Sequence, residues 1–350
     1  MIPILYEKSE TAFLTNGLGA LTDCIKCNVT ERLNDYYTLQ LTYDANGKHA
    51  GDIVPGNLIL ATPSDGANPQ PFRIYETSKN LDGTINANAN HISYDLGGYF
   101  ARNITGITTA AGAIEALTSR AWLPTGFTIT TDLSVTKNWE KRGAFSIRSA
   151  MGGDGSILET YGGEWKYDGY NVQLLQARGQ DNGVTIRYRK NLTGLEAVTN
   201  DENDYTGTFS YWLSGGTYVS STDITYVSTA AQSAVPQKIL IVDHTSDFQS
   251  EPTKAQLDAL AASDLANVGI IKSLTVSFVP LWRSSEYKDL APIERVQMGD
   301  IVGVIYDRFN VNVKLEVVQT DYNVLLDKYN SIELGALRPS LADTIINLSK

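Results

Sequence analysis

Apolar and polar residues alternate along most of the first hundred residues and again near the end of the chain. In YYTLQLTY (36–43) apolar or aromatic side chains occupy every second position from Tyr37, and VNVKLEVV (311–318) has the same period. A period of two places alternate side chains on opposite faces of a β-strand. A loop rich in Gly, Asn and Pro at 63–71 breaks the runs, as expected between strands. The pattern predicts β structure at both ends of the chain.

The middle of the chain has helical spacing instead. From 108 to 122 small and apolar residues recur three and four apart, with a threonine at 108 or 109 as the N-cap. SILETYGG (156–163) combines a capping box, Ser156 with Glu159, with a stop at two glycines. EWKYDGYNVQL (164–174) predicts a hairpin with the two-residue turn Asp168–Gly169.

Two further helices are expected in the second half. EPTKAQLDALAASDLANVG (251–269) has an apolar stripe and a capping box formed by Thr253 and Gln256. PSLADTIINLSK (339–350) predicts a short C-terminal helix.

One stretch near the start is echoed near the end. GNLILA (56–61) and GDIVGV (299–304) share a glycine, a polar residue and an apolar run, at an offset of 299 − 56 = 243. The similarity continues without a gap to Asn80 and Asn323. Long-period self-similarity usually marks repeated structure. The sequence therefore predicts two copies of one β unit, and a trimer of such chains would present six similar units to a hexameric ring.

These patterns predict a mainly β, multidomain chain with α+β insertions, since 350 residues exceed one ordinary core. The expected parts are a first β-barrel-like domain at 1–101, an α+β domain at 102–190, a second β-barrel-like domain at 191–338 with a helix inserted near 253–268, and the C-terminal helix at 339–350.

The net charge and the first ten residues bear on whether the protein binds nucleic acid, attaches to a membrane or carries a signal peptide. The 28 Lys and Arg against 39 Asp and Glu give a net charge of −11, which disfavours a phosphate-backbone binder and a polybasic membrane anchor. MIPILYEKSE lacks the basic and apolar regions of a signal peptide. No apolar run reaches the roughly 18 residues that a membrane-spanning helix needs.

The only cysteines are in CIKCNV (24–29). A regular strand would place Cys24 and Cys27 on opposite faces about 10 Å apart, beyond the roughly 7 Å between Cα atoms that a disulfide allows. Zinc needs four ligands, and the chain has no second cysteine pair. We therefore expect two free thiols rather than a redox or metal site.

INANANHISYDLGGYF (85–100) raises the possibility of an acid–base site, because His91 precedes Asp95 by four residues. The preceding residues alternate as a strand, so this spacing does not ensure contact. The pair also lacks a nucleophile or a metal partner. We favour a histidine at a strand end that is hydrogen-bonded to the backbone or to Asp95.

Four other motifs have ordinary structural explanations. Glu159 and Glu164 follow the capping box, and the acidic loop NDENDY (200–205) lacks the turn glycine of a calcium loop. GGDGS (152–156) lacks the Lys-Ser/Thr of a P-loop, and RYRKN (187–191) is one basic strand that we interpret as a solvated or interface edge. We assign no catalytic, cofactor-binding or metal-binding residue and expect no cofactor.

Five segments, in order from near residue 20 to near residue 343, resemble the tail-hub family of siphophages and prophages, also called the prophage tail endopeptidase or tail-associated lysin family. They are TERLNDYYTLQLTY, QPFRIY, NANHISYDL, GGDGSILETYGGEWKYDGYNVQLLQARGQDNGVTIRYRKNL and LGALRPSLAD.

The resemblance implies a fold like the baseplate hub of contractile-tailed phages and a homotrimer at the virion tail tip, assembled in the host cytoplasm. It implies contacts with the distal tail protein hexamer, the tape measure protein and a fibre or receptor-binding protein. DNA would pass through the ring without specific binding, past a neutral or acidic wall. The chain ends where the hub module usually ends, so we expect no lytic extension and no enzyme activity.

Three functions from different classes are therefore compared. The first is a structural tail-tip hub, and the second is a tail-associated cell-wall peptidase that acts during infection. The third is a receptor-binding or carbohydrate-binding module, which would need exposed loops rich in aromatic residues. The five tryptophans are scattered, at 122, 139, 165, 212 and 282, and give this third function little support.

Overall fold

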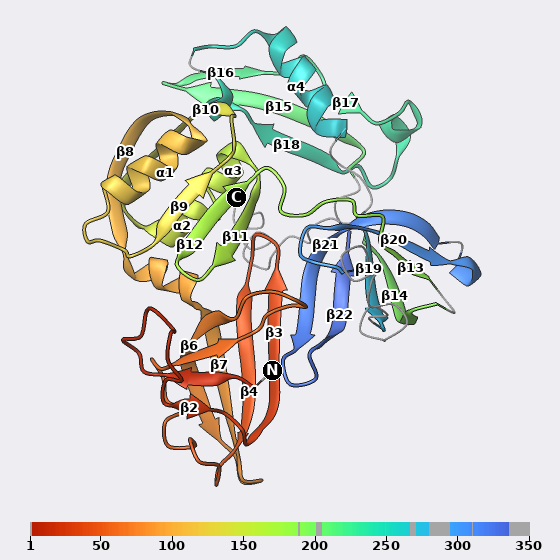
Figure 1. Cartoon of the computed structure of the whole chain (residues 1–350). Helices are drawn as coiled ribbons and strands as arrows, with labels where there is room; N and C mark the ends of the chain where they lie inside the picture. Colours follow the sequence, from red (N-terminus) through yellow and green to blue (C-terminus); the bar gives the residue numbers. More distant parts are fainter. Residues whose placement is uncertain are drawn as a thin grey trace.

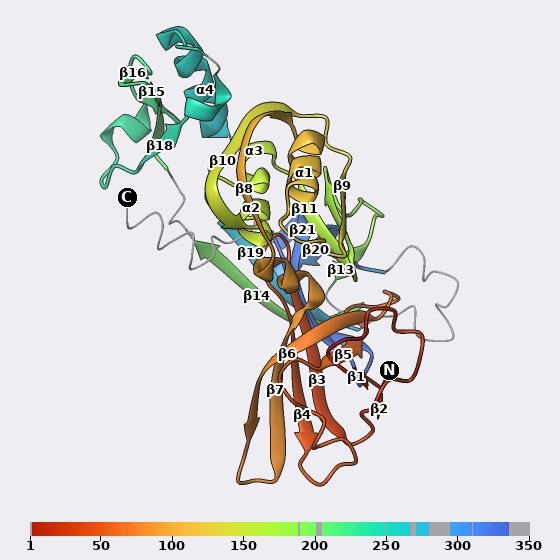
Figure 2. The same ribbon diagram turned by 90° about the vertical axis from the view of Figure 1, so that its left-hand side faces the viewer.

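The computed structural model describes residues 2–187, 190–200, 205–248, 250–266, 271–279, 295–309 and 311–335. Over these residues the protein is mainly β and multidomain, as the alternation predicts, with one large sheet and three small ones (Figure 1). Seen from the side, the strands of the N-terminal part lie at one end of the molecule, and α4 with its small sheet lies at the other (Figure 2). The expected C-terminal helix at 339–350 lies outside the described residues.

The N-terminal part forms half of the large sheet, in the order β3-β4-β7-β6-β5-β1-β2. Its strands are β1 (Ile4–Tyr6), β2 (Gly19–Ala20), β3 (Cys24–Arg32), β4 (Tyr37–Asp44), β5 (Leu58–Ala61), β6 (Gln70–Lys79) and β7 (Thr84–His91). The alternating residues of β4, from Tyr37 to Tyr43, have their apolar set buried, as the pattern predicts. We call β3 to β7 the first β unit.

The C-terminal part forms the other half, in the order β14-β19-β22-β21, with β20 paired to β21 and β13 paired to β20. Its strands are β13 (Thr185–Arg187), β14 (Leu192–Asn200), β19 (Ile271–Phe278), β20 (Ile301–Tyr306), β21 (Val311–Asn323) and β22 (Lys328–Leu334), with the short 3-10 helix η6 (Asp307–Phe309) between β20 and β21. We call β14 with β19 to β22 the second β unit.

The echo found in the sequence is repeated in the hydrogen-bond register. In the β5–β6 hairpin Leu58 pairs with Arg73, and in the β20–β21 hairpin Ile301 pairs with Glu316. Both partners are shifted by 243 (301 − 58 and 316 − 73), and the other three pairs of the first hairpin follow the same offset. The predicted repeat is therefore confirmed.

The glycine that opens the echo has the same role in both copies. Gly56 has φ +97° and donates to Ile74 O at 2.8 Å, and Gly299 has φ +86° and donates to Val317 O at 2.9 Å. A positive φ is readily adopted only by glycine. The shared glycine therefore fixes the same entry of the chain into the hairpin.

The repeat extends to all five strands and includes their irregularities. Cys24 pairs with Tyr43 in the first unit, and Leu192 pairs with Phe278 in the second, a shift of 192 − 24 = 168 for β3 and β14. Each of these strands has a bulge directly after that pair. The bulge between Ile74 and Glu76 of β6 likewise recurs between Val317 and Gln319 of β21.

The α+β part follows the 3-10 helix η1 (Ile92–Gly98) and covers one end of the first unit. Its elements are β8 (Phe100–Thr109), α1 (Ala110–Ser119), β9 (Thr128–Thr131), β10 (Thr136–Ser146), α2 (Ile147–Met151), α3 (Ile157–Tyr161), β11 (Glu164–Asp168) and β12 (Asn171–Leu175). Thr109 caps α1 by accepting from Gly112 N at 3.1 Å. Ser156 caps α3 by accepting from Glu159 N at 3.1 Å, as predicted.

The predicted turn of the β11–β12 hairpin is wrong by one residue. Asp168 pairs with Asn171, so the two-residue turn is Gly169–Tyr170 rather than Asp168–Gly169. Gly169 has φ +56°, which fits a turn with glycine at its first central position. The reason is a tertiary contact, because Gln70 of β6 donates to Asp168 Oδ1 at 2.7 Å and accepts from Gly169 N at 2.6 Å.

A small α+β body separates the first strand of the second unit from the rest. It comprises β15 (Gly207–Ser214), β16 (Thr217–Ser220), β17 (Thr225–Tyr226), η2 (Ala230–Ser233), β18 (Ile239–Asp243), η3 (Thr245–Asp247) and α4 (Lys254–Ala266). The predicted inserted helix is α4. Its capping box is present, since Thr253 N donates to Gln256 Oε1 at 2.9 Å and Gln256 N donates to Thr253 Oγ1 at 3.3 Å.

The described residues form three large apolar cores, one for the α+β part and one for each β unit. The two β cores exchange residues at their boundary. Leu33, which follows β3, is buried in the core of the second unit, whereas Val324, which follows β21, is buried in the core of the first unit. The two units are thus held together by apolar contacts as well as by strand pairing.

Candidate functional site

His91 and Asp95 do not form an acid–base pair. Asp95 accepts hydrogen bonds from Arg73, from Nε to Oδ1 at 2.9 Å and to Oδ2 at 3.0 Å, and from Nη2 to Oδ2 at 2.7 Å. The His91 ring is wholly buried, accepts from Ser93 N at 3.2 Å, and stacks on Tyr37 with centroids 4.5 Å apart. Burial, aided by the charge of Arg148, lowers the pKa of His91 to about 3. The histidine therefore stays neutral and caps η1 through the backbone, which was one of the two expected arrangements.

The two cysteines are unbonded, but the reason given by a regular strand is wrong. The bulge between Cys24 and Lys26 shifts the alternation, and both sulfur-bearing residues contact the core of the first unit. A hydrogen bond with Cys24, together with burial, raises the pKa of the Cys27 thiol. Cys27 is therefore a poor nucleophile, because the thiolate is the reactive form.

The glycine-rich GGDGS segment is part of a closed turn. The carboxylate of Glu159 accepts from Gly155 N, and Lys141 Nζ donates to the carbonyl oxygens of Asp154 and Gly155. A phosphate would compete with Glu159 for the same backbone donor. Of the basic segment RYRKN, Arg187 lies at the end of β13 and its N–H donates to Asn191 Oδ1 at 2.9 Å; the acidic loop NDENDY lies almost wholly outside the described residues.

Glu164 contacts a different carboxyl group from the one considered in the sequence. Burial, followed by a hydrogen bond with Glu164 and the charge of that carboxylate, raises the pKa of Glu316 to about 7. Glu164 also accepts from Arg178 N at 2.7 Å. Two carboxyl groups of similar environment can share one proton, so this pair is the strongest acid–base candidate among the described residues.

A buried ion pair joins the α+β part to the first unit. Arg178 Nη1 donates to Glu31 Oε1 at 2.7 Å and to Trp165 O at 3.0 Å, and both charged side chains are about one-tenth exposed. These residues line a cavity of about 240 Å³ where the first unit, the α+β part and the second unit meet. Next to Arg178, Gly179 lies directly against the Gly299 backbone. This contact region holds three parts of the chain in fixed positions.

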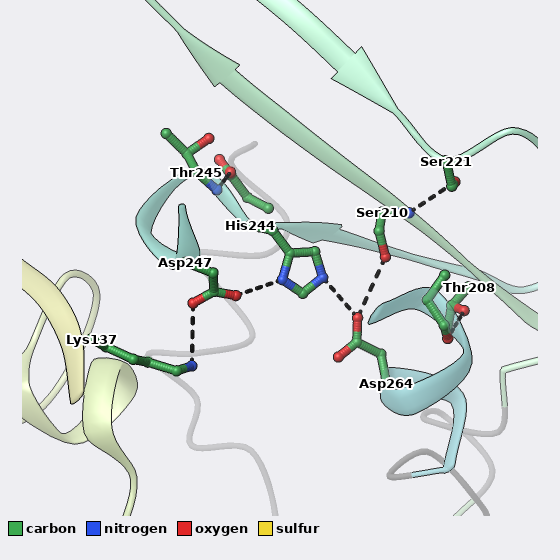
Figure 3. A network of polar contacts seen from close by, with 10 residues as sticks. Lys137, Thr208, Ser210, Ser221, His244, Thr245, Asp247 and Asp264 are labelled. Carbon is green, nitrogen blue, oxygen red and sulfur yellow. Dashed lines mark hydrogen bonds and ion pairs between the residues drawn. The ribbon is translucent and has the colours of Figure 1, made fainter. Parts of the chain in front are cut away.

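A second polar network joins the inserted body to the α+β part (Figure 3). His244 Nδ1 contacts Asp247 Oδ2 at 2.7 Å, and Nε2 contacts Asp264 Oδ2 at 2.9 Å. Lys137 of β10 completes the network with an ion pair to Asp247 at 3.2 Å. Burial alone would lower the pKa of His244, but the hydrogen bonds to both carboxylates outweigh burial and raise it. The His244 ring therefore bridges η3 and α4 of the inserted body.

The His244 network does not have the order of a nucleophile and base. The Ser210 hydroxyl lies 3.5 Å from Asp264 rather than beside the imidazole, and both ring nitrogens are occupied by carboxylates. Within the described residues no group of three His, Cys, Asp or Glu side chains is placed to hold a metal ion. None of the described helices is long and apolar enough to cross a membrane. The sequence missed this network because Asp264 is distant in the chain, although the close spacing of His244 and Asp247 was a visible signal.

The tryptophans have separate structural roles. Trp139 and Trp165 are buried and donate to the carbonyl oxygens of Gly155 and Met151. Trp212 is also buried, whereas Trp122 is exposed, stacks on Phe100 and lies under the Arg102 guanidinium. Trp282 lies outside the described residues. One exposed aromatic pair is a small surface for a carbohydrate.

The two β units are joined by strand pairing between segments from opposite ends of the chain. Residues Gln319–Asn323 of β21 pair antiparallel with Asn28–Arg32 of β3. Outside the paired segment, Leu33 N donates to Val318 O and Val324 N donates to Cys27 O, both at 2.9 Å. The geometry is that of a continuous sheet across the two units.

Solved structures of tail proteins have a similar architecture. The chain is similar in fold to prophage tail protein gp18 from Listeria monocytogenes EGD-e, with 15% identity and a TM-score of 0.62 over 100% of this chain and 98% of that one. It is also similar to the prophage MuSo2 tail protein from Shewanella oneidensis (12% identity, TM-score 0.61, 97% and 99% covered) and to a tail protein from Neisseria meningitidis MC58 (11%, 0.62, 96% and 96%). At these identities the likeness shows the fold.

The sequence itself matches a family over part of its length. Residues 180–345 match the family described as Prophage endopeptidase tail. No curated protein matches the chain. The resemblance to prophage tail proteins that the motifs indicate is thus confirmed, by the family match for the second β unit and by the fold for the whole chain.

Proposed function

We propose that the protein is a structural tail-hub subunit of a siphophage or prophage. Three copies would form a ring at the tail tip that continues the tail tube and surrounds the DNA exit. The observation that carries the proposal is the duplicated β unit, whose two copies share strand order, the register of the β5–β6 and β20–β21 hairpins, and two bulges. Three chains with two such units each give six similar units, which can match a six-fold tube.

The contacts within the chain agree with a rigid scaffold. The two β units form one sheet and exchange core residues, and the Arg178–Glu31 pair fixes the α+β part against the first unit. A ring that transmits force and guides DNA needs such fixed orientations. The proposed partners are the distal tail protein hexamer, the tape measure protein and a fibre or receptor-binding protein. DNA would pass without specific binding, because a chain of net charge −11 offers few cations for phosphates.

Oligomeric state tests this proposal directly. Light scattering of the purified protein over a concentration series should give three times the chain mass, and negative-stain electron microscopy should show closed rings. Addition of a hexameric distal tail protein should promote the ring if the isolated chain associates weakly. A protein that stays monomeric with and without that partner would contradict the proposal.

A cell-wall peptidase is the second candidate, and the Glu164–Glu316 pair is the observation that favours it. A carboxyl group with a pKa of about 7 is suited to proton transfer near neutral pH. A zymogram with purified cell walls separates the two functions. Clearing by the native chain that a Glu316→Gln variant loses would establish the enzyme; the hub proposal expects no clearing by either protein.

A further inference from the structure

The strand pairing within the chain provides a template for pairing between chains. In the second unit, Gln319–Asn323 of β21 have β22 on one side and β3 of the first unit on the other. The counterparts of these residues in the first unit, at the offset of 243, are Glu76–Asn80 at the end of β6. They have β7 on one side, and no strand of the described residues on the other.

The opposite edge of the sheet has the complementary half of the template. Asn28–Arg32 of β3 have β4 on one side and β21 on the other. Their counterparts in the second unit, at the offset of 168, are Glu196–Asn200 of β14. This strand is the last of the large sheet and pairs only with β19 among the described strands.

Apolar side chains beside the strand edge are buried in the second unit, where the edge is paired, and exposed in the first unit, where it is open. Val318 and Val324 flank the paired segment of β21, and both are wholly buried. Their counterparts at the offset of 243 are Tyr75, which is 55% exposed, and Leu81, which is fully exposed. Two large apolar side chains beside an open strand edge are unusual on a lone chain, because such edges favour association.

We infer that Glu76–Asn80 of one chain pair antiparallel with Glu196–Asn200 of a second copy, which repeats the internal β21–β3 pairing between subunits. The register follows from the two offsets: Ser78 lies opposite Val198, as Asp321 lies opposite Thr30 within the chain. Tyr75 and Leu81 would then be covered by the neighbouring chain, as Val324 is covered by the core of the first unit. This inference rests on the proposed ring, for which it names the contact between subunits.

The two edges are different surfaces of one chain, so the contact is head-to-tail. Head-to-tail contacts close into rings when the rotation between copies divides the circle, and otherwise form filaments. If the rotation between neighbouring chains equals the rotation between the two β units of one chain, three chains close into a ring. Three β21–β3 pairings within chains then alternate with three β6–β14 pairings between chains. Every edge of the large sheet in this region would then be paired.

The register can be tested by disulfide trapping. Because Val318 O and Val324 N both bond to β3, alternation makes Asp321 and Thr30 a pair without direct hydrogen bonds. Such pairs have Cα atoms roughly 4.5 Å apart, which suits a disulfide. The test variant is therefore Ser78→Cys with Val198→Cys, in a chain that also carries Cys24→Ser and Cys27→Ala.

The matched control is Ser78→Cys with Thr199→Cys, because successive residues of a β-strand are expected to face opposite sides of the sheet. Under mild oxidation the 78/198 variant should convert most of its monomer band to a covalent trimer on non-reducing gels, at least ten-fold more than the control. A trimer by light scattering without 78/198 cross-linking, or with equal cross-linking of the control, would overturn the inference and leave the ring intact. A 78/198 ladder that extends beyond three chains would support the contact but contradict a closed trimer. A chain that is monomeric in every variant would contradict both.

Discussion

The two β units share one architecture but differ in what surrounds them. Their strands pair in the same order and share two bulges, although β21–β22 has a further one between Asp321 and Tyr322. The strands β3 and β14 have no identical residue in the nine aligned positions. The connection from β3 to β4 has four residues (33–36), whereas the connection from β14 to β19 has seventy (201–270) and contains the inserted body. The register of the strands is thus fixed by alternation, bulges and the shared glycine. The connection between the first two strands of a unit does not affect it, and in the second unit that connection contains the inserted body.

The surroundings also decide which side chains are exposed. At the end of β21, Val318 and Val324 are wholly buried, Val324 in the core of the first unit. At the end of β6, Tyr75 and Leu81 are exposed. The same position in the same fold is therefore a core position in one copy and a surface position in the other. Substitutions at matched positions can measure this difference.

The largest difference is expected for an aspartate placed at the boundary between the units. Val324→Asp should lower the free energy of unfolding by roughly 4 kcal/mol or prevent folding, because it puts a charge without a partner into the core of the first unit. Leu81→Asp should change the free energy of unfolding by less than about 0.5 kcal/mol, since its position is exposed. Urea unfolding of dilute monomer would measure both. Equal losses would show that the two positions are not distinguished by burial.

A smaller contrast is expected at the two glycines that open the hairpins. Ala at Gly56 meets only the Lys8 side chain, at 3.8 Å or more, so the cost is the positive φ, about 1 kcal/mol. Ala at Gly299 meets Gly179 N at 2.8 Å and Arg178 Cβ at 3.0 Å, and the backbone clash should bring the cost to about 3 kcal/mol. Urea midpoints of Gly56→Ala and Gly299→Ala test this. A larger loss for Gly56→Ala would contradict the structure around Gly179.

The smallest effects are expected in the pH dependence of the free energy of unfolding. The histidine of the first unit and the histidine of the body inserted into the second unit should contribute with opposite signs. His91 ends β7 of the first unit, and burial followed by the charge of Arg148 lowers its pKa to about 3. Below pH 6.5 His91 is therefore protonated in the unfolded chain but stays neutral in the folded chain. The free energy of unfolding then decreases by at most about 1.4 kcal/mol for each unit that the pH is lowered. His91→Gln should flatten this acid limb in urea titrations at pH 7 and pH 5.

His244, in the body inserted into the second unit, should act in the opposite direction. Burial is outweighed by the hydrogen bonds to Asp247 and Asp264, which raise its pKa above 6.5. Its contribution to stability is therefore complete below pH 6.5 and is lost as the pH rises through the raised pKa. His244→Gln should cost about 1 kcal/mol at pH 6 and less at pH 8. A loss that is the same at both pH values would show that the ring is not charged in the folded chain.

Local patterns were sufficient for part of the secondary structure, although they did not predict the long strands β8 and β10 of the α+β part. The alternation in β4 and β21, the caps Thr109 and Ser156 and the capping box of α4 depend on residues within four positions of one another, so they could be predicted without the rest of the chain. The echo of β5–β6 in β20–β21 was visible because those segments kept similar residues. Its extension to β3 and β14 was not, since only the pairing register and the bulge were retained.

The tertiary structure decided every contact that joins distant segments. Glu31 and Arg178 are 147 residues apart, and Arg32 contacts Gln319 across 287 residues. No local period encodes such pairs, because they depend on which apolar faces and strand edges meet in the folded chain. For the same reason the bulge in β3 places Cys24 and Cys27 against the same core, although alternation predicted opposite faces. Contacts with Gln70 likewise move the turn of the β11–β12 hairpin by one residue. The sequence by itself determined the strands, the helix caps and the repeat, whereas only the fold decided that one copy of the repeated edge is covered and the other is open, because coverage depends on the neighbour and not on the strand.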